Sequence, residues 1–222
     1  MRTFYILVTF AVRFSEHKGK NQIKMKKKVL YLHGFASAGS SGTAVQMRSH
    51  LYPMGASVLS PDIPVSPLEA MDMLRKIVEE ESPDLIVATS MGALYAEQLY
   101  GTPRLLVNPS FHMARLLMLR GMGRQEFRNK RADGARDFKV DRPLIAEYQQ
   151  VEKQSFAHID ATEKGKVYGL FGLQDKKVNC QPDFKKHYGK DNLILFQGEH
   201  YLNGQVLGAV VMPLVEKLLF GE

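Results

Sequence analysis

The chain has 222 residues, of which 45% are hydrophobic and 24% are charged, with 30 Lys and Arg residues against 23 Asp and Glu. This composition excludes a disordered, collagen-like or coiled-coil protein, and the length predicts one domain or one domain with an insertion. Cys180 is the single cysteine, which excludes an intramolecular disulfide and favours a cytoplasmic protein.

The N-terminal 24 residues carry more than half of the net charge of +7. They hold five basic residues and one acidic residue, a surplus of four, which leaves +3 for the rest of the chain. Arg2 and the apolar run 4–12 imitate a secretory signal, but no cleavage site follows and the run is too short to span a bilayer. We expect residues 1–24 to be a dispensable extension of a domain at 25–222; an extra edge strand or helix, or a working export signal, are the alternatives.

From residue 29 onward, short apolar runs alternate with helical patterns, which predicts an α/β fold with a mostly parallel sheet flanked by helices. Most of the predicted strands are continuous apolar runs, as expected where helices cover both faces of a sheet. The predicted strands are Val29–Leu32, Ala56–Ser60, Leu85–Thr89, Leu105–Val107, Val167–Phe171 and Leu193–Phe196.

Three predicted helices have clear end signals. Residues 66–69, Ser-Pro-Leu-Glu, form a capping box with proline at the first helical position, and Ser82-Pro83 ends that helix. A second helix is expected from about Ser90 to Tyr100, and a C-terminal helix from about Gln205 to Phe220.

The segment from about 110 to 164 interrupts this alternation and predicts an inserted helical lid. Met113, Met118 and Met122 are expected to form its core or a wall for an acyl chain. Its basic residues are either a solvated face or a recognition site for a substrate phosphate or carboxylate. These residues are Arg115, Arg120, Arg124, Arg128, Lys130, Arg131 and Arg136.

The most informative motif is the apolar strand 85–89 followed by Ser90, Met91 and Gly92. A sharp turn from strand to helix requires small residues around the serine, and Ala88 and Gly92 meet that requirement. Such a turn exposes the Ser90 hydroxyl at the carboxyl edge of the sheet and directs the Met91 N–H at a developing negative charge. A buried serine at a helix N-cap is the alternative.

A second motif, His33-Gly34-Phe35, follows the first predicted strand. We expect the Phe35 backbone N–H to be the second oxyanion donor, because Gly34 lets the backbone approach the substrate closely. His33 is interpreted as a structural hydrogen-bonding residue rather than the catalytic base, because the order in this arrangement is serine, acid, histidine.

Two later strands end at residues that complete this order. Asp175 follows the strand 167–171, and His200 follows the strand 193–196. Because the carboxyl ends of parallel strands meet at one edge, Asp175 can hold the His200 imidazole in the tautomer that accepts a proton from Ser90. An Asx turn at Asp175 and a surface position for His200 are the alternatives.

Taken together, the Tyr31–Phe35 motif, the turn at Ser90, Asn108 after its strand, Asp175 and His200 resemble the α/β-hydrolase superfamily. Within it, the chain resembles the small YqiA-like bacterial esterases over about residues 27–220. Ala88 replaces the more frequent glycine, a mild steric change. The resemblance implies hydrolysis of carboxylic esters or thioesters through an acyl-enzyme, with no metal or organic cofactor. It implies Ser90 as nucleophile, Asp175 as acid, His200 as base, and Phe35 and Met91 as backbone oxyanion donors.

Other functions are less well supported by the sequence. We expect a small-molecule ester or thioester as partner and no nucleic acid or membrane, because no nucleic-acid motif accompanies the basic residues and Trp is absent. No histidine spacing typical of a metal site occurs. A non-catalytic binding protein with this fold, and acyl transfer or C–C cleavage by the same triad, remain as alternatives, and the oligomeric state is left open.

Overall fold

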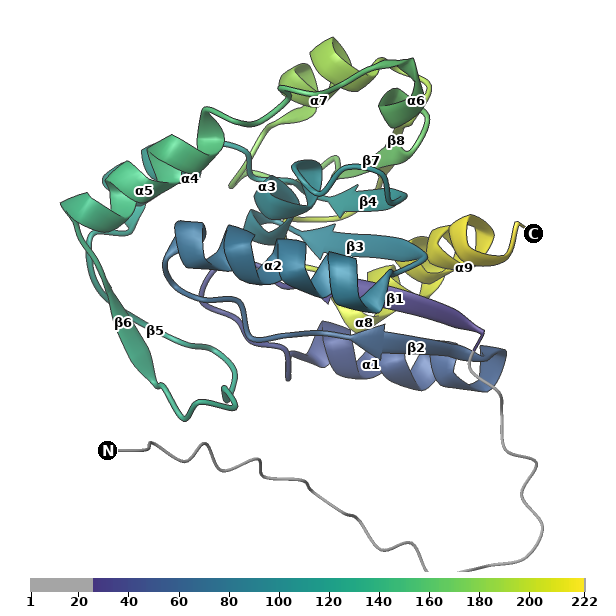
Figure 1. The fold of residues 1–222 in the computed structure, drawn as a ribbon, viewed down its shortest axis with the longest axis horizontal. Helices are drawn as coiled ribbons and strands as arrows, with labels where there is room; N and C mark the ends of the chain where they lie inside the picture. Colours follow the sequence, from purple (N-terminus) through teal and green to yellow (C-terminus); the bar gives the residue numbers. More distant parts are fainter. Residues whose placement is uncertain (1–25, 222) are drawn as a thin grey trace, which may run out of the picture.

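A six-stranded sheet forms the centre of the computed structural model, which describes residues 26–221 (Figure 1). The strand order is β2-β1-β3-β4-β7-β8, and every neighbouring pair is parallel. The expectations for residues 1–24 lie outside the described residues, whereas all six predicted strands are present. They are β1 (Lys27–Leu32), β2 (Ala56–Leu59), β3 (Leu85–Thr89), β4 (Arg104–Val107), β7 (Val167–Gly172) and β8 (Leu193–Phe196).

Helices cover both faces of this sheet, which explains the continuous apolar strands. Alternate strand residues point to opposite faces, so Leu30 and Ile86 belong to one buried cluster while Val29 and Val87 belong to the other. The first cluster includes α2 (Pro67–Glu81), α3 (Met91–Glu97) and α7 (Gln181–Tyr188). The second includes α1 (Gly42–Leu51), which the 3-10 turn Tyr52–Met54 follows, and the C-terminal helical segment. The predicted α/β fold is therefore confirmed.

The helix ends follow the sequence signals with two differences. The Ser66 hydroxyl accepts a hydrogen bond from the Glu69 N–H at 3.3 Å, and α2 ends at Ser82 with φ 44°. The helix after Ser90 is shorter than predicted, since α3 ends at Glu97 and a turn leads to Gly101. The predicted C-terminal helix consists of α8 (Gly204–Val206), the π-helical turn Leu207–Val211 and α9 (Met212–Phe220).

Residues 108–166, called the insertion from here on, connect β4 to β7. They form α4 (Met113–Arg120), the antiparallel hairpin β5 (Gly123–Glu126) and β6 (Asp137–Val140), α5 (Arg142–Glu152) and α6 (Ala161–Lys164). The prediction of a helical insertion was therefore incomplete, because it did not include these two strands. Figure 1 shows the hairpin projecting away from the central sheet, while α4 and α5 pack on the first cluster. The β5 sequence, Gly-Arg-Gln-Glu, lacks the apolar alternation by which a strand is recognised.

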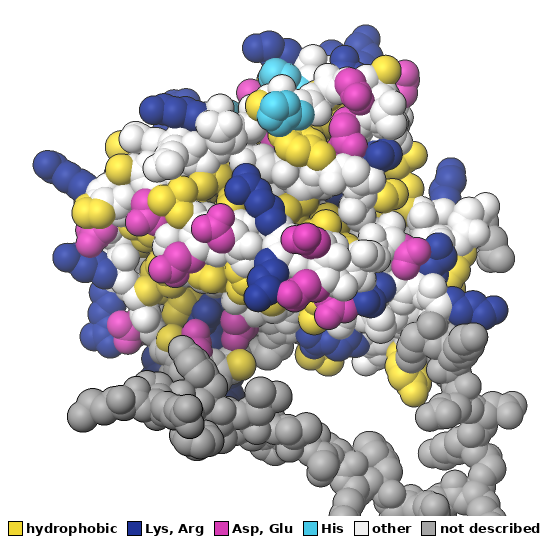
Figure 2. All heavy atoms as spheres, viewed as in Figure 1, with side chains coloured by type: hydrophobic (Ala, Val, Ile, Leu, Met, Phe, Trp, Pro, Cys, Tyr) yellow, Lys and Arg dark blue, Asp and Glu magenta, His cyan; other side chains and the backbone are white. Residues whose placement is uncertain are grey.

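The surface drawn in Figure 2 has acidic and basic side chains interspersed, in keeping with the small net charge of the chain beyond its first 24 residues. Within residues 26–221, no helix has both the length and the apolar character needed to cross a membrane.

Gly92, the second residue of α3, tests how tightly this helix packs on β1. A Cβ atom built there would overlap the Leu32 carbonyl oxygen and lie 2.8 Å from the His33 carbonyl oxygen. We expect Gly92→Ala to lower the free energy of unfolding by about 1–3 kcal/mol, as overpacking does. Urea denaturation measures this. Gly208→Ala is the matched control because no atom lies within 4 Å of its Cβ position; equal stability of the two variants would contradict the predicted crowding.

Candidate active site

Ser90 lies in a backbone conformation that few non-glycine residues adopt. Its φ and ψ are 52° and −118° at the junction of β3 and α3. The peptide is held on both sides, because the Ser90 N–H donates to the Val107 carbonyl at 3.0 Å and the Ser90 carbonyl accepts from the Ser110 N–H at 3.1 Å. Gly34 leaves room in front of the hydroxyl, since a Cβ there would lie 3.3 Å from the Ser90 Cβ. The turn expected from the sequence is present.

Ser90, His200 and Asp175 are brought together in a hydrogen-bonded chain. Ser90 Oγ lies 2.9 Å from His200 Nε2, and His200 Nδ1 lies 2.7 Å from Asp175 Oδ2. The side chains of His200 and Asp175 are 7% and 6% exposed. A carboxylate at Nδ1 favours the tautomer with the proton on that nitrogen, which leaves Nε2 free to accept a proton from Ser90.

The Asp175 carboxylate is stabilised in its charged form. Burial raises the pKa of Asp175, but hydrogen bonds from His200 and from the Val178 and Lys177 N–H groups outweigh burial and keep the pKa below its usual value. The two N–H donors lie 3.0 and 2.8 Å from Asp175 Oδ1. The acid is therefore ionised at neutral pH, as an orienting carboxylate must be.

The two expected oxyanion donors belong to residues near Ser90. Met91 follows it at the first position of α3, and Phe35 lines the same pocket as Ser90 and His200. Within residues 26–221, neither N–H is hydrogen-bonded to another group. Two N–H groups without acceptors beside a serine hydroxyl are the arrangement that stabilises a tetrahedral oxyanion.

His33 occupies a structural position, as the sequence suggested. Its Nδ1 lies 2.9 Å from the Gly34 carbonyl, and its Nε2 accepts from the Ile63 N–H at 3.1 Å. Burial lowers the pKa of His33 below its usual value. The ring is therefore neutral and occupied at both nitrogens, and it supports the loop that carries Phe35.

The sequence indicated no separate role for Asn108, which was only part of a motif after its strand. In the structure, its side chain connects three segments of the site. Its Nδ2 donates to the carbonyls of Glu199 at 2.9 Å and His200 at 3.0 Å, while its Oδ1 accepts from the Gly172 N–H at 2.7 Å. One buried amide thus joins the ends of β4 and β7 to the His200 loop. An Asn directly after a strand is the sequence signal that could have suggested it, since Asn tolerates the left-handed backbone found here, with a φ of 44°.

A segment of the insertion, residues 127–132, is hydrogen-bonded to the oxyanion loop, residues 34–40. Asp62 bridges the two, since it accepts from the Gly39 N–H at 2.7 Å and from the Ala132 N–H at 2.6 Å. The other hydrogen bonds between them run from Arg128 N to Ala36 O, from Arg128 Nη2 to Phe35 O, from Ser37 Oγ to Asn129 Oδ1, and from Ser40 Oγ to Lys130 O. The insertion therefore supports the loop that carries Phe35.

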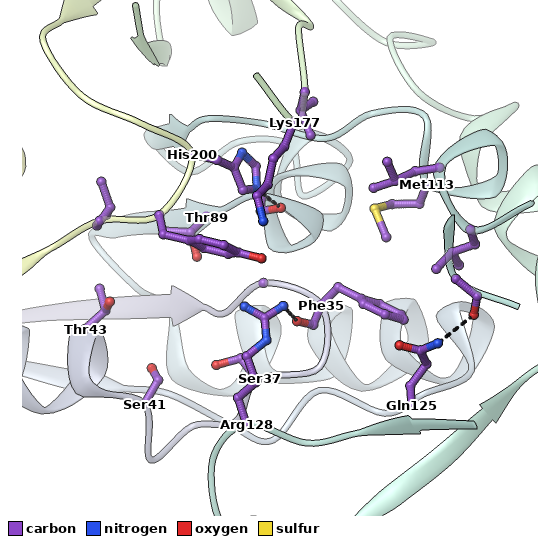
Figure 3. A pocket seen from close by; sticks show the side chains of 18 of the residues that line it. Phe35, Ser37, Ser41, Thr43, Thr89, Met113, Gln125, Arg128, Lys177 and His200 are labelled. Atoms are coloured by element: carbon purple, nitrogen blue, oxygen red, sulfur yellow. Dashed lines mark hydrogen bonds between the residues drawn. The ribbon is translucent and has the colours of Figure 1, made fainter. Parts of the chain in front are cut away.

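A pocket of ≈ 410 Å³ opens above Ser90 and is shown in Figure 3. Its apolar wall comes from α4 and contains Met113, Leu116 and Leu117, whereas Met118 and Met122 are half exposed and do not line it. A group of hydroxyl-bearing side chains lines another part: Tyr31, Ser41, Thr43 and Thr89. The volume and mixed lining are typical of a small-molecule site.

Three ligand-type side chains outside this pocket come close together. The ligand atoms of His112, Cys180 and Asp183 lie within 4.8 Å of one another. Burial raises the pKa of the Cys180 thiol to about 11. Because metal coordination requires the thiolate, burial works against metal binding at this group.

Replacing Asn108 tests its connecting position. We expect Asn108→Ala to lower kcat about 10- to 100-fold with a smaller effect on KM, because displacement of His200 disturbs proton transfer. It should also cost about 1–3 kcal/mol of stability, since the Gly172 N–H loses its acceptor. Asn192→Ala at the amino end of β8, where the amide bonds the Lys164 carbonyl, is the control. A fall confined to KM would contradict a positioning role.

The lowered pKa of His33 predicts a pH dependence of stability. A histidine whose pKa is lower in the folded state contributes stability that is present above its unfolded value of about 6.5 and is lost as the pH falls below it. We expect the free energy of unfolding to decrease from about pH 7.5 to about pH 5, and His33→Gln to reduce that slope. Urea denaturation across pH measures it, with the exposed His158→Gln as control. An unchanged slope in His33→Gln would contradict the assignment.

Comparison with known proteins agrees with this architecture. The structure of a protein from Agrobacterium vitis S4 has a TM-score of 0.65 at 15% identity, with 89% of this chain and 91% of that chain covered. Est1E from Butyrivibrio proteoclasticus gives 0.60 at 17% identity, covering 89% and 90%. The mouse alpha/beta hydrolase domain-containing protein 10 gives 0.58 at 14% identity, covering 87% and 91%. At these identities the likeness establishes the fold.

No sequence among the curated proteins matches the chain. The family described as "Uncharacterised protein family (UPF0227)" matches residues 28–205, which include the strands, the insertion and the residues of the hydrogen-bonded chain at Ser90. The chain therefore belongs to this family and has the α/β-hydrolase fold.

Proposed function

We propose that the protein is a serine hydrolase that cleaves carboxylic esters or thioesters through an acyl-enzyme. The observation that carries the proposal is the chain from Ser90 Oγ to His200 Nε2 at 2.9 Å and from His200 Nδ1 to Asp175 at 2.7 Å, at the base of a pocket. The fold supports it, since related folds include Est1E, which has been solved with ferulic acid bound. The insertion, whose residues line the pocket, is proposed to act as its lid.

In the first half of the reaction, His200 Nε2 accepts the Ser90 proton as Oγ forms a bond to the acyl carbon. The π electrons of the carbonyl move to its oxygen, and the Phe35 and Met91 N–H groups stabilise the resulting oxyanion. The bond from the acyl carbon to the leaving oxygen or sulfur then breaks, and His200 gives its proton to that atom. Asp175 stays ionised throughout and stabilises the imidazolium.

The second half repeats these steps with water. His200 accepts a proton from water as the hydroxide oxygen bonds to the acyl carbon. The bond from Ser90 Oγ to that carbon breaks, Oγ takes back the proton, and a carboxylic acid leaves. The balance is one ester or thioester and one water consumed, one acid and one alcohol or thiol released, with no oxidant, reductant or cofactor required.

Two competing functions make different use of the same fold. A non-catalytic binding protein has no need for a serine held at a φ of 52° or for a buried carboxylate behind a histidine. Acyl transfer and C–C cleavage by the same triad differ in the acceptor and the bond broken, so product analysis separates them from hydrolysis.

Ser90→Ala tests the proposal. We expect the variant to keep its unfolding free energy within about 1 kcal/mol and to lose about 10⁴-fold or more in kcat, because triad members act as a unit. Hydrolysis of 4-nitrophenyl acetate gives the rate. A fluorophosphonate probe followed by peptide mapping identifies the reacting residue, with Ser57→Ala, on β2, as the control. Near-normal turnover in Ser90→Ala, or a label at another residue, would identify a different nucleophile.

A further inference from the structure

Of the residues that the structure describes, three basic side chains and no carboxylate line the pocket at Ser90. They are Arg120, Arg128 and Lys177, two from the insertion and one from the loop of Asp175. Within residues 26–221, none of the three forms a salt bridge, whereas other basic side chains of the insertion do: Arg124 pairs with Asp137 and Arg131 with Asp133. The pocket therefore carries positive charge that its own side chains do not neutralise.

Two of these cations meet at a single aromatic ring. Lys177 Nζ lies 4.2 Å and Arg128 Cζ 4.9 Å from the centroid of the Tyr201 ring. Figure 3 shows Lys177 beside His200 and Arg128 across the pocket, with the charged ends of both directed toward the space between them. Arg128 is held by its hydrogen bond to the Phe35 carbonyl at 3.2 Å. Two cations at one ring make this side of the pocket electropositive, which favours an anion there.

The pKa of Tyr201 reflects the positive charge around its hydroxyl. Burial raises the pKa of its hydroxyl, but Lys177 and Arg128 outweigh burial and lower that pKa below its usual value. A field that favours a phenolate also favours a carboxylate or phosphate at the same place.

The position of Tyr201 next to His200 also indicates which part of the substrate would lie near the two cations. Tyr201 follows His200 in sequence, and the centroids of the two rings lie 5.3 Å apart. In the proposed reaction, His200 donates a proton to the leaving atom, so the leaving group must lie against His200. The apolar wall of Met113, Leu116 and Leu117 then remains for the acyl group. The cations therefore lie on the side of the leaving group.

We propose that Lys177 and Arg128, which both lie against the Tyr201 ring, form a subsite for an anionic group on the alcohol or thiol part of the substrate. The ligand chemistry is a carboxylate or phosphate monoester on the leaving group. This inference rests on the proposed function. The anion takes no part in bond changes: the acyl carbon exchanges its leaving atom for Ser90 Oγ and then for water, and the anionic alcohol departs with one proton from His200.

Matched esters test the subsite. The anionic substrate is 4-acetoxybenzoate and its neutral partner is methyl 4-acetoxybenzoate; 4-acetoxyphenyl phosphate distinguishes phosphate from carboxylate. The mono-4-nitrophenyl ester of succinic acid places the carboxylate on the acyl side. The measured quantity is the ratio of kcat/KM for the anionic ester to kcat/KM for the neutral one. Using a ratio removes any general effect of Arg128 on the oxyanion loop.

We expect Lys177→Gln to lower this ratio about 2- to 5-fold, and Lys177→Gln with Arg128→Gln about 4- to 25-fold, since each exposed pair contributes modestly. Lys176→Gln, which removes a neighbouring exposed charge outside the pocket, should leave the ratio unchanged. The preference should weaken as salt rises from about 0.01 to about 1 M. An unchanged ratio in the double variant, or an equal fall in Lys176→Gln, overturns the subsite. An equal loss of kcat/KM for the succinate ester also overturns the assignment of the subsite to the leaving group.

Binding of 4-hydroxybenzoate separates this inference from the proposed function. In an NMR titration of Ser90→Ala, we expect binding that weakens on Lys177→Gln and no comparable binding of methyl 4-hydroxybenzoate. If neither ester is hydrolysed but this binding persists, the proposed hydrolase function fails and the anion subsite stands. If the neutral ester is hydrolysed through Ser90 and 4-hydroxybenzoate does not bind, the subsite fails and the hydrolase stands.

Discussion

The backbone turn at Ser90 is the constraint on which the site depends. A φ of 52° is costly for serine, and it persists because β3, α3 and the segment after β4 hold the peptide at both ends. The turn requires close approach of α3 to β1, which excludes a side chain at Gly92, and close approach of the oxyanion loop, which favours glycine at 34. One strained residue therefore sets the spacing of the helix, the sheet and the loop.

The parallel sheet supplies the rest of the arrangement. Because β3, β4, β7 and β8 run the same way, their carboxyl ends bring Ser90, Asn108, Asp175 and His200 to one edge. Asn108 then fixes the His200 loop relative to the sheet, since its amide donates to the Glu199 and His200 carbonyls and accepts from the N–H at the end of β7. The insertion contributes the apolar pocket wall and two of the three pocket cations, Arg120 and Arg128, whereas the hydrogen-bonded chain from Ser90 to Asp175 lies at the sheet edge.

Features with a local cause were predictable from the sequence. The six strands follow from apolar runs, and Ser90, Asp175 and His200 each follow a strand in a recognisable order. The hairpin of β5 and β6 was not predicted, because β5 has no apolar alternation and the alternation of β6 spans only four residues. Phe138 of β6 packs against Phe35, a contact that no local pattern encodes. Arg128 and Lys177 both contact Tyr201. Lys177 follows Arg128 by 49 positions and precedes Tyr201 by 24, so no local pattern encodes their convergence.

The bridge through Asp62 has a consequence for how substrate reaches the serine. The segment 127–132 and the oxyanion loop share this carboxylate and several other hydrogen bonds, so a displacement of one would strain or break its contacts with the other. A swing of that segment large enough to widen the entrance would carry the Phe35 N–H away from the position of the oxyanion. Under the proposed mechanism, such an open conformation would lack one of the two oxyanion donors, so acyl transfer to Ser90 would be favoured only after the segment returns.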